Sequence, residues 1–201
     1  HTDEEWSDGR YWFSRTEYVL FMAKTCPSLT DITIHNANFK LANFLTVLHK
    51  CKYLTTIDIC ECKRVIEGRG LESVAELCPQ LESLAISHSN RISEGVLHSI
   101  ATRCRKLSSF RIKEKMGLFL DNEISPVGFA NFALHCPSLH TLHLFNIHVH
   151  YADVYTLATR CQGLRDLSLG SFTCVGAPAD VWFPQVIAFF PHLRTVFLAR
   201  D

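Results

Sequence analysis

Cysteine and histidine are the residues of this chain whose types and spacing could support chemistry. The 201 residues include nine cysteines and eleven histidines. These side chains can form disulfides, bind metal ions or take part in nucleophilic catalysis. Two local groupings deserve testing: the sequence Cys60-Glu61-Cys62, and a set of histidines close together in the chain, at His135, His140, His143, His148 and His150.

Neither grouping has the spacing that a metal site requires. Structural zinc sites use Cys-x₂₋₄-Cys pairs together with a second pair of ligands, and no second pair is spaced to match Cys60 and Cys62. Three or four of the histidines would have to converge, and their placement on a predicted strand and the following loop does not force them to. The alternative to a metal site is structural: the two cysteines occupy the strand-end position of the repeat, and the histidines are solvated or capped. We expect no metal and no cofactor.

The chain also lacks the local sequences that accompany common catalytic sites. It contains no G-x-x-x-x-G-K-[ST] or G-x-G-x-x-G phosphate-binding loop, and nothing in it resembles the sharp turn that presents a catalytic serine. An odd number of cysteines also fits poorly with a closed disulfide framework. We therefore expect a non-catalytic binding domain with no catalytic residues.

Six of the cysteines begin the same nine-residue pattern, Cys-x-x-Leu-x-x-φ-x-φ, in which φ is Leu, Ile, Val or Phe. A seventh copy begins at Phe190, and successive copies start 25, 27, 26, 32, 25 and 29 residues apart. An L-x-x-L-x-L pattern that recurs every 20–29 residues or so is typical of leucine-rich repeats. The six cysteines, which we call the anchor cysteines, are Cys26, Cys51, Cys78, Cys104, Cys136 and Cys161.

Each copy combines a strand pattern with a helical pattern. Leu142 and Leu144 alternate with polar residues, as on a strand with one buried face. The stretch before each anchor, such as VLHSIATRC, has its apolar residues at helical spacing. We predict an α/β fold, a right-handed leucine-rich-repeat solenoid of seven strand–helix units with a parallel sheet on its concave side. The strands are expected near 30–34, 55–59, 82–86, 108–112, 140–144, 165–169 and 194–198.

The repeated anchor has a structural interpretation. A cysteine is small and weakly polar, so it can end each helical stripe and pack between turns of the core. Phe190 replaces it in the last copy, and a phenyl ring can neither bind metal nor form a disulfide. We expect all six anchor cysteines to be reduced and largely buried. Free thiols of this kind fit a reducing compartment, the cytoplasm and/or the nucleus.

Charge and hydropathy narrow the classes of partner. Twenty Lys and Arg balance twenty Asp and Glu, so the formal net charge is zero. A broad nucleic-acid-binding surface would normally carry a basic excess, and we expect no nucleic-acid partner. No apolar run approaches the roughly 18 residues of a membrane helix, and we expect no membrane partner.

The repeat sequences resemble the Cys-containing leucine-rich-repeat family, as found in F-box/LRR ubiquitin-ligase substrate receptors. Residues 91–104, RISEGVLHSIATRC, are similar to its helical segment almost throughout. Residues 68–78 match the second half of that segment, and residues 124–129 are a variant of its turn. The resemblance implies a protein-binding module that selects substrates for an F-box type (SCF) ubiquitin ligase. The alternative is a leucine-rich-repeat scaffold or assembly subunit unrelated to ubiquitin.

The resemblance begins at about residue 17, which suggests how the chain is organised. We expect residues 1–16 to be a linker or flanking segment and residues 17–201 to be a leucine-rich-repeat domain, as a fragment of a longer repeat array. The first 16 residues do not resemble an F-box. A ligase adaptor and a cullin would therefore be partners only if an F-box lies outside this sequence.

One stretch of the predicted concave face has residue types that dominate protein interfaces. Arg111 and Lys113 lie on the fourth predicted strand, beside His143 and Phe145 on the fifth, and aromatic and arginine anchors are frequent interface hot spots. The loop KEKMGLFLDNEI leaves the same strand and is apolar for a solvated turn. Alternatively, the loop folds back over the solenoid and the charges are simply solvated. The predicted site for a protein partner comprises Arg111, Lys113, Met116, Phe119, His143 and Phe145.

Overall fold

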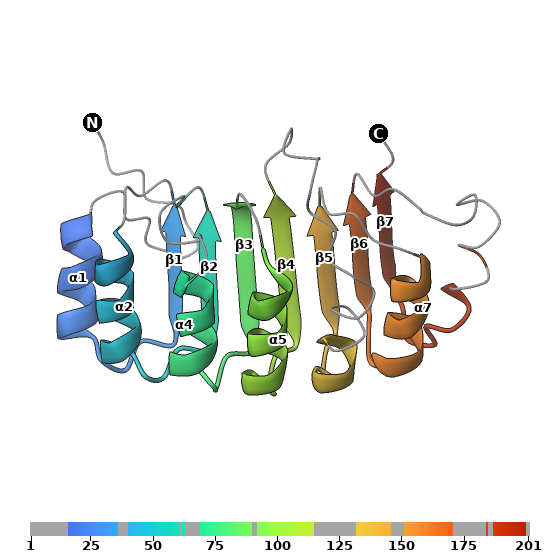
Figure 1. The fold of residues 1–201 in the computed structure, drawn as a ribbon, viewed down its shortest axis with the longest axis horizontal. Coiled ribbons are helices and arrows are strands. Elements are labelled where there is room, and N and C mark those ends of the chain that lie inside the picture. Colours follow the sequence, from blue (N-terminus) through green and yellow to red (C-terminus); the bar gives the residue numbers. More distant parts are fainter. Residues whose placement is uncertain are drawn as a thin grey trace.

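The protein forms a row of strand–helix units in a computed structural model (Figure 1). The structure describes residues 16–35, 40–60, 62, 69–89, 92–114, 132–145, 151–170, 184 and 187–199. The helices are α1 (Thr16–Thr25), α2 (Leu41–Lys50), α4 (Arg69–Leu77), α5 (Glu94–Arg103) and α7 (Tyr151–Arg160). The strands are β1 (Asp31–His35), β2 (Thr56–Cys60), β3 (Ser83–Ser89), β4 (Ser109–Glu114), β5 (Thr141–Phe145), β6 (Asp166–Gly170) and β7 (Thr195–Ala199).

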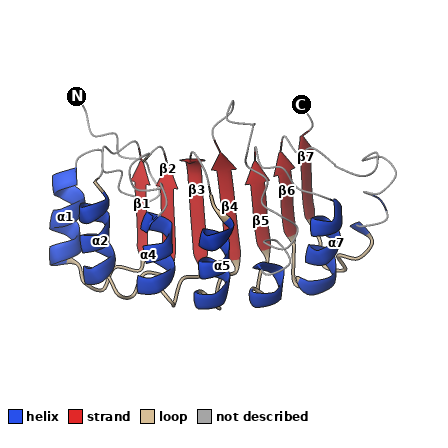
Figure 2. Ribbon diagram, in the orientation of Figure 1, coloured by secondary structure: helices blue, strands red, loops and turns tan. Residues whose placement is uncertain are grey.

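The strands form one parallel sheet in which neighbours in sequence are neighbours in space. Its order is β1-β2-β3-β4-β5-β6-β7, and all six pairs are parallel. The labelled helices lie on one side of this sheet (Figure 2). Each strand is added on the same side of the one before it, and right-handed crossovers in one direction place their helices on one face of the sheet. The predicted α/β leucine-rich-repeat solenoid of seven units is confirmed.

Each strand begins one residue later than the repeat pattern predicted. The residue predicted to open the strand still belongs to the turn, because two successive N–H groups converge on one carbonyl there. The amides of Thr55 and Thr56 both donate to the carbonyl of Thr30, at 2.7 and 3.0 Å. The same arrangement recurs in every later unit, through to Arg194 and Thr195 on the carbonyl of Arg165. This repeated bond joins each turn to the one before it and sets the register of the next strand.

The core is a continuous apolar layer between the sheet and the helices. Leu54, Leu81, Leu107, Leu139 and Leu164 occupy the fourth position of successive patterns and are fully buried. They stack on the inward side chains of the strands and on one stripe of each helix. No single unit can bury both of its apolar faces alone, so stacking is what stabilises the array.

The anchor cysteines form a column at the C-terminal ends of the helices. Each of the six anchor amides donates to the carbonyl four residues earlier, at 2.7–3.1 Å, which closes the last helical turn. The Cys104 thiol contacts the carbonyl of Cys78 at 3.6 Å, and the Cys161 thiol contacts that of Cys136 at 3.9 Å. Phe190 occupies the same place in the seventh unit and is 5% exposed. The column is therefore part of the core.

One anchor cysteine is less buried than the others. Cys26 is only partly buried, whereas the other five anchors are buried. It ends α1, and among the described helices only α2 packs against α1. An interior anchor is covered by a unit on each side, but Cys26 is covered by the described residues from one side only. Cys26 is thus the least buried of the six anchors.

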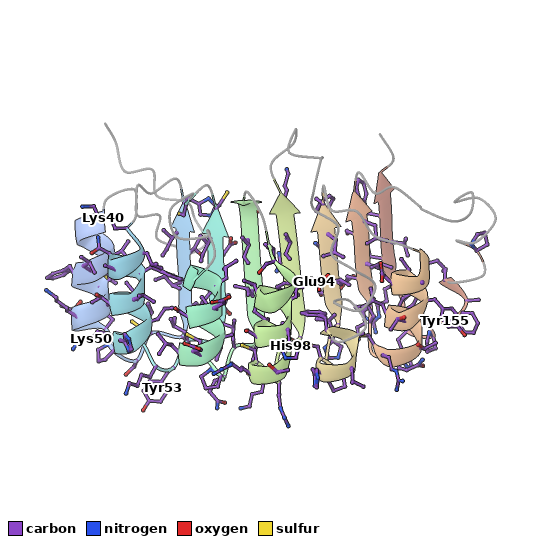
Figure 3. All side chains as sticks on the ribbon, viewed as in Figure 1. Lys40, Lys50, Tyr53, Glu94, His98 and Tyr155 are labelled. Atoms are coloured by element: carbon purple, nitrogen blue, oxygen red, sulfur yellow. The ribbon has the colours of Figure 1, made fainter. Side chains whose placement is uncertain are left out.

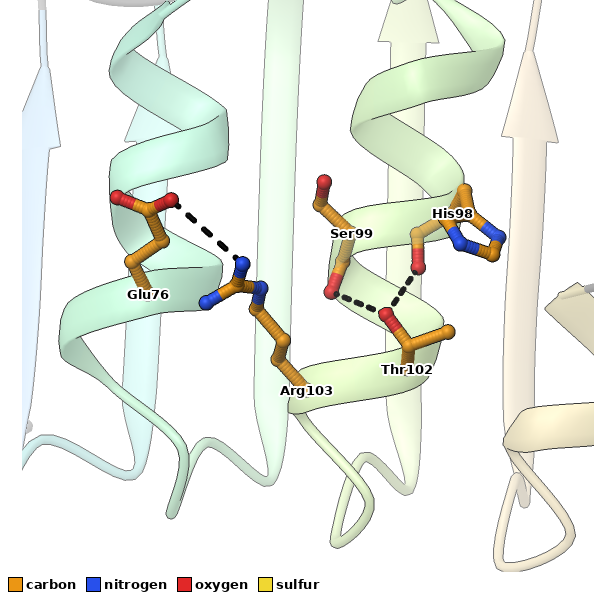
Figure 4. A network of polar contacts seen from close by, with 5 residues as sticks. All are labelled: Glu76, His98, Ser99, Thr102 and Arg103. Carbon is orange, nitrogen blue, oxygen red and sulfur yellow. Dashed lines mark hydrogen bonds and ion pairs between the residues drawn. The ribbon is translucent and has the colours of Figure 1, made fainter.

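Polar contacts on the outer helical surface contribute little to this framework. Arg103 on α5 lies 3.7 Å from Glu76 on α4, and Thr102 donates to the carbonyls of His98 and Ser99 (Figure 4). The Arg103 and Glu76 side chains are both more than half exposed, and exposed ion pairs are typically worth about 1 kcal/mol or less. Stability therefore depends on the stacked core.

Candidate functional site

The side of the sheet opposite the helices is the surface predicted to be concave, and we call it the open face. It is formed by alternate strand residues, because successive side chains of a strand point to opposite sides. In β1, β2 and β5, the open-face residues are half-buried or exposed, and the residues between them are buried. The register aligns one row across all seven strands: Thr33, Asp58, Ala85, Arg111, His143, Ser168 and Phe197.

The structure brings together the four predicted site residues that lie on strands. Arg111 pairs in register with His143, and Lys113 pairs with Phe145. The His143 and Phe145 rings meet edge to face with their centroids 6.3 Å apart. Both cationic side chains are exposed, and the Arg111 Nε donates to the Ser109 hydroxyl at 3.4 Å. The result is a compact group of two cations and two rings, whose role in binding a partner stays a prediction.

The other two predicted site residues belong to the loop after β4. Met116 and Phe119 lie outside the described residues. The predicted contribution of this loop to partner binding therefore stays a prediction.

Sequence reasoning missed a third aromatic member of this group. The Phe145 ring on β5 contacts the Phe197 ring on β7, with centroids 6.0 Å apart. The strand between them, β6, carries Ser168 and Gly170 at the aligned positions. Ser168 is 6% exposed although it lies on the open face. Two small residues on β6 are the sequence signal that could have shown that rings two strands apart can meet.

His143 is neutral in this environment at neutral pH. Burial lowers its pKa below the usual value of 6.5, and the neighbouring Arg111 guanidinium lowers it further, while Asp166 partly opposes the shift. Asp166 also accepts a hydrogen bond from the Thr141 hydroxyl at 3.4 Å. Above pH 6.5 the group therefore has two formal positive charges, on Arg111 and Lys113, rather than three.

A hollow lies beside this group over the first strands of the sheet. Its volume is about 520 Å³, and α1 residues form part of its wall. Its open-face wall is made mostly of small or acidic side chains, and Arg111 lies at its border with the aromatic group. The open-face residues are Asp31, Thr33, Thr56, Asp58, Ser83, Ala85 and Arg111. The hollow is thus lined mostly by apolar residues, with the carboxylates of Asp31 and Asp58 on its open-face wall, whereas the group beside it is cationic and aromatic.

The Cys60/Cys62 pair and the grouped histidines make contacts with the surrounding protein. Cys62 is buried, and its thiol contacts the carbonyls of Cys60 and Ile34 at 3.3 and 3.6 Å. The His135 ring packs edge to face on His98, with centroids 6.3 Å apart, and His148 and His150 lie outside the described residues. Within the described part of the chain, no three His, Cys, Asp or Glu residues are grouped so that they could hold a metal ion.

Among the helices that the structure describes, none is both long and apolar enough to cross a membrane.

Comparison with known proteins gives a partial similarity. No protein-family profile matches the chain. GRR1-like protein 1 from Arabidopsis thaliana is 27% identical over 106 residues, an alignment that covers 49% of this chain and 18% of that protein. An internalin (InlF) from Listeria monocytogenes aligns with 90% of this chain and 71% of its own, at 13% identity and a TM-score of 0.30. The alignment thus covers less than a fifth of the length of GRR1-like protein 1.

Proposed function

We propose that this leucine-rich-repeat chain binds a protein partner through its open face and is the substrate-recognition part of an F-box type ubiquitin ligase. The observation that carries the binding role is the group of Arg111, Lys113, His143, Phe145 and Phe197 on three strands of one exposed sheet face. A cluster of aromatic residues beside an arginine has the composition of an interface hot spot. The stacked core holds these side chains on rigid strands.

Two observations support the link to ubiquitin ligases. The repeat sequences resemble those of F-box/LRR receptors, most closely at residues 91–104. The partial similarity to GRR1-like protein 1 is also compatible with this assignment. In such a ligase, an F-box outside this sequence would bind the adaptor, the cullin would be part of the same complex, and the open face would bind the substrate. The proposed location is the cytoplasm and/or the nucleus.

The ligase assignment is tested with the full gene product that contains this chain. We expect the tagged full-length protein to co-purify with the ligase adaptor and the cullin, and residues 1–201 alone to bind neither. Absence of both subunits from the full-length purification would contradict the ligase assignment. It would favour the alternative of a leucine-rich-repeat scaffold or assembly subunit.

The binding surface is tested separately with a double variant, Arg111→Glu/Phe145→Ala. We expect it to lose the proteins that the wild type captures in quantitative mass spectrometry, with no change in the far-ultraviolet circular dichroism spectrum. The matched control is Arg105→Glu/Tyr53→Ala, which alters an exposed cation and an exposed ring in the turns that follow the helices. Tyr53 is labelled in Figure 3. Equal capture by the wild type and both variants would place the binding site elsewhere.

A further inference from the structure

The Phe145–Phe197 pair forms an apolar contact surface above β6. Strands β5 and β7 are two strand spacings apart, about 10 Å, yet the two ring centroids are 6.0 Å apart. The rings therefore lean toward each other over Ser168 and Gly170. Phe197 is still 49% exposed, so an apolar side chain of a partner can pack against the pair.

A cationic position lies at a defined distance from this apolar surface. Arg111 is in the same row as His143, Ser168 and Phe197. It is exposed, as is Lys113, and within the described residues neither has an ion-pair partner within 4 Å. From β4 to β6 is again about 10 Å, which an extended peptide covers in about three residues at about 3.3 Å each.

Two carboxylates of the hollow limit where a negative charge of the partner can lie. Asp31 and Asp58 are on β1 and β2, on the side of Arg111 away from the aromatic pair. A partner segment that continues past Arg111 in that direction meets these carboxylates, and like charges in contact across an interface cost affinity. A negative charge of the partner is thus favoured at β4 and disfavoured over β1 and β2.

We infer that the open face recognises a protein segment that crosses the strands and carries an apolar side chain about three residues from an aspartate or glutamate. The apolar side chain packs on the Phe145–Phe197 pair and the carboxylate pairs with Arg111. This inference rests on the proposed function, because it names the chemistry of the partner at the same site. A carboxylate is favoured over a phosphate, because phosphate-binding domains use clusters of arginines, and this site has Arg111 with Lys113.

A peptide selection against residues 1–201 tests the inference. A display library of random twelve-residue peptides is selected on the wild-type chain and counter-selected on Phe145→Ala/Phe197→Ala. We expect enrichment of peptides with Leu, Phe or Trp three residues from Asp or Glu, in either chain direction. Enrichment of basic peptides, or no enrichment of this spacing over the input library, would overturn the inference.

Synthetic versions of an enriched peptide test each contact by fluorescence polarisation. Arg111→Glu should weaken binding at least tenfold, whereas the control Arg105→Glu should change it less than twofold. Moving the acidic residue from the third position to the first should weaken binding at least fivefold. Equal affinities in either comparison would refute the assigned geometry. A phosphoserine peptide that binds more than tenfold tighter than its glutamate counterpart would refute the inferred preference for a carboxylate over a phosphate.

Failure of this inference can be told apart from failure of the proposed function. If Arg111→Glu/Phe145→Ala loses its cellular partners while selected peptides lack the spacing, the open face binds partners of another chemistry. If that variant keeps its partners, the proposed surface itself is wrong.

Discussion

The column of buried thiols should make the protein unstable in alkali. Burial raises the pKa of Cys78, Cys136 and Cys161 to about 12, with neighbouring anchors adding to the rise at Cys78 and Cys136. Burial also raises the pKa of Cys104 to about 11, although Arg103 partly opposes it. The unfolded chain, in contrast, releases these protons near pH 9.0. Because the folded pKa values are raised, their contribution to stability is complete below pH 9 and is lost as the pH rises toward 11–12.

The magnitude at pH 10 follows from these values. Each unfolded thiol is then about 90% ionised while each folded thiol is still mostly protonated, a difference worth about 1.4 kcal/mol. The four thiols together should lower the free energy of unfolding by about 5.5 kcal/mol between pH 7 and pH 10. This is a large part of the roughly 5–15 kcal/mol by which domains are stable.

A single replacement isolates the thiol effect from other groups that titrate in alkali. Urea unfolding of Cys136→Ala and the wild type is measured at pH 7 and pH 10 with a reducing agent present. The destabilisation caused by the replacement should be about 1.4 kcal/mol smaller at pH 10, because the variant no longer loses that thiol's contribution. Val74→Ala, a buried truncation in α4 without a titratable group, should cost the same at both pH values. Equal costs of Cys136→Ala at both pH values would refute the reasoning.

Three further outcomes follow from burial and charge. Leu84→Ala should lower the free energy of unfolding by about 2–5 kcal/mol in urea titration, since Leu84 is fully buried; an unchanged midpoint would contradict its place in the core. In native alkylation followed by mass spectrometry, Cys26 should react before Cys136, because it is the partly exposed anchor; the reverse order would contradict the assigned burial. Stability should fall as the pH drops below about 6.5, because the pKa of His143 is lowered in the folded chain and protons then bind the unfolded chain more tightly. The variant His143→Gln should lose less stability than the wild type between pH 7.5 and 5.5. An identical loss in both proteins would exclude His143 as a cause.

The repeat pattern was enough to predict most of the fold. Its period placed the starts of seven strands to within one residue, and its apolar positions, such as Leu142 and Leu144, are buried. These features are local, because each unit repeats the same strand and helix periodicities. The ends of β3 and β4 lie three and two residues beyond the predicted ones. The pattern did not predict the partial exposure of Cys26. Exposure at that position depends on what stacks against the outer side of the unit, and a repeat consensus treats all units alike.

The candidate site could be predicted from the sequence only in part. The residue types on the open face follow from alternation along each strand, so Arg111 and His143 could be placed on it from sequence. Which side chains meet across strands depends on register and on the size of the residues between them. The contact of Phe145 with Phe197 spans 52 residues of sequence and exists because β6 carries a serine and a glycine beneath the rings. The sequence by itself therefore determined a stacked repeat with one exposed sheet face, because periodicity is a local property. Only the tertiary structure decided that this face holds an aromatic pair beside two cations and a hollow, because those neighbours come from different repeats.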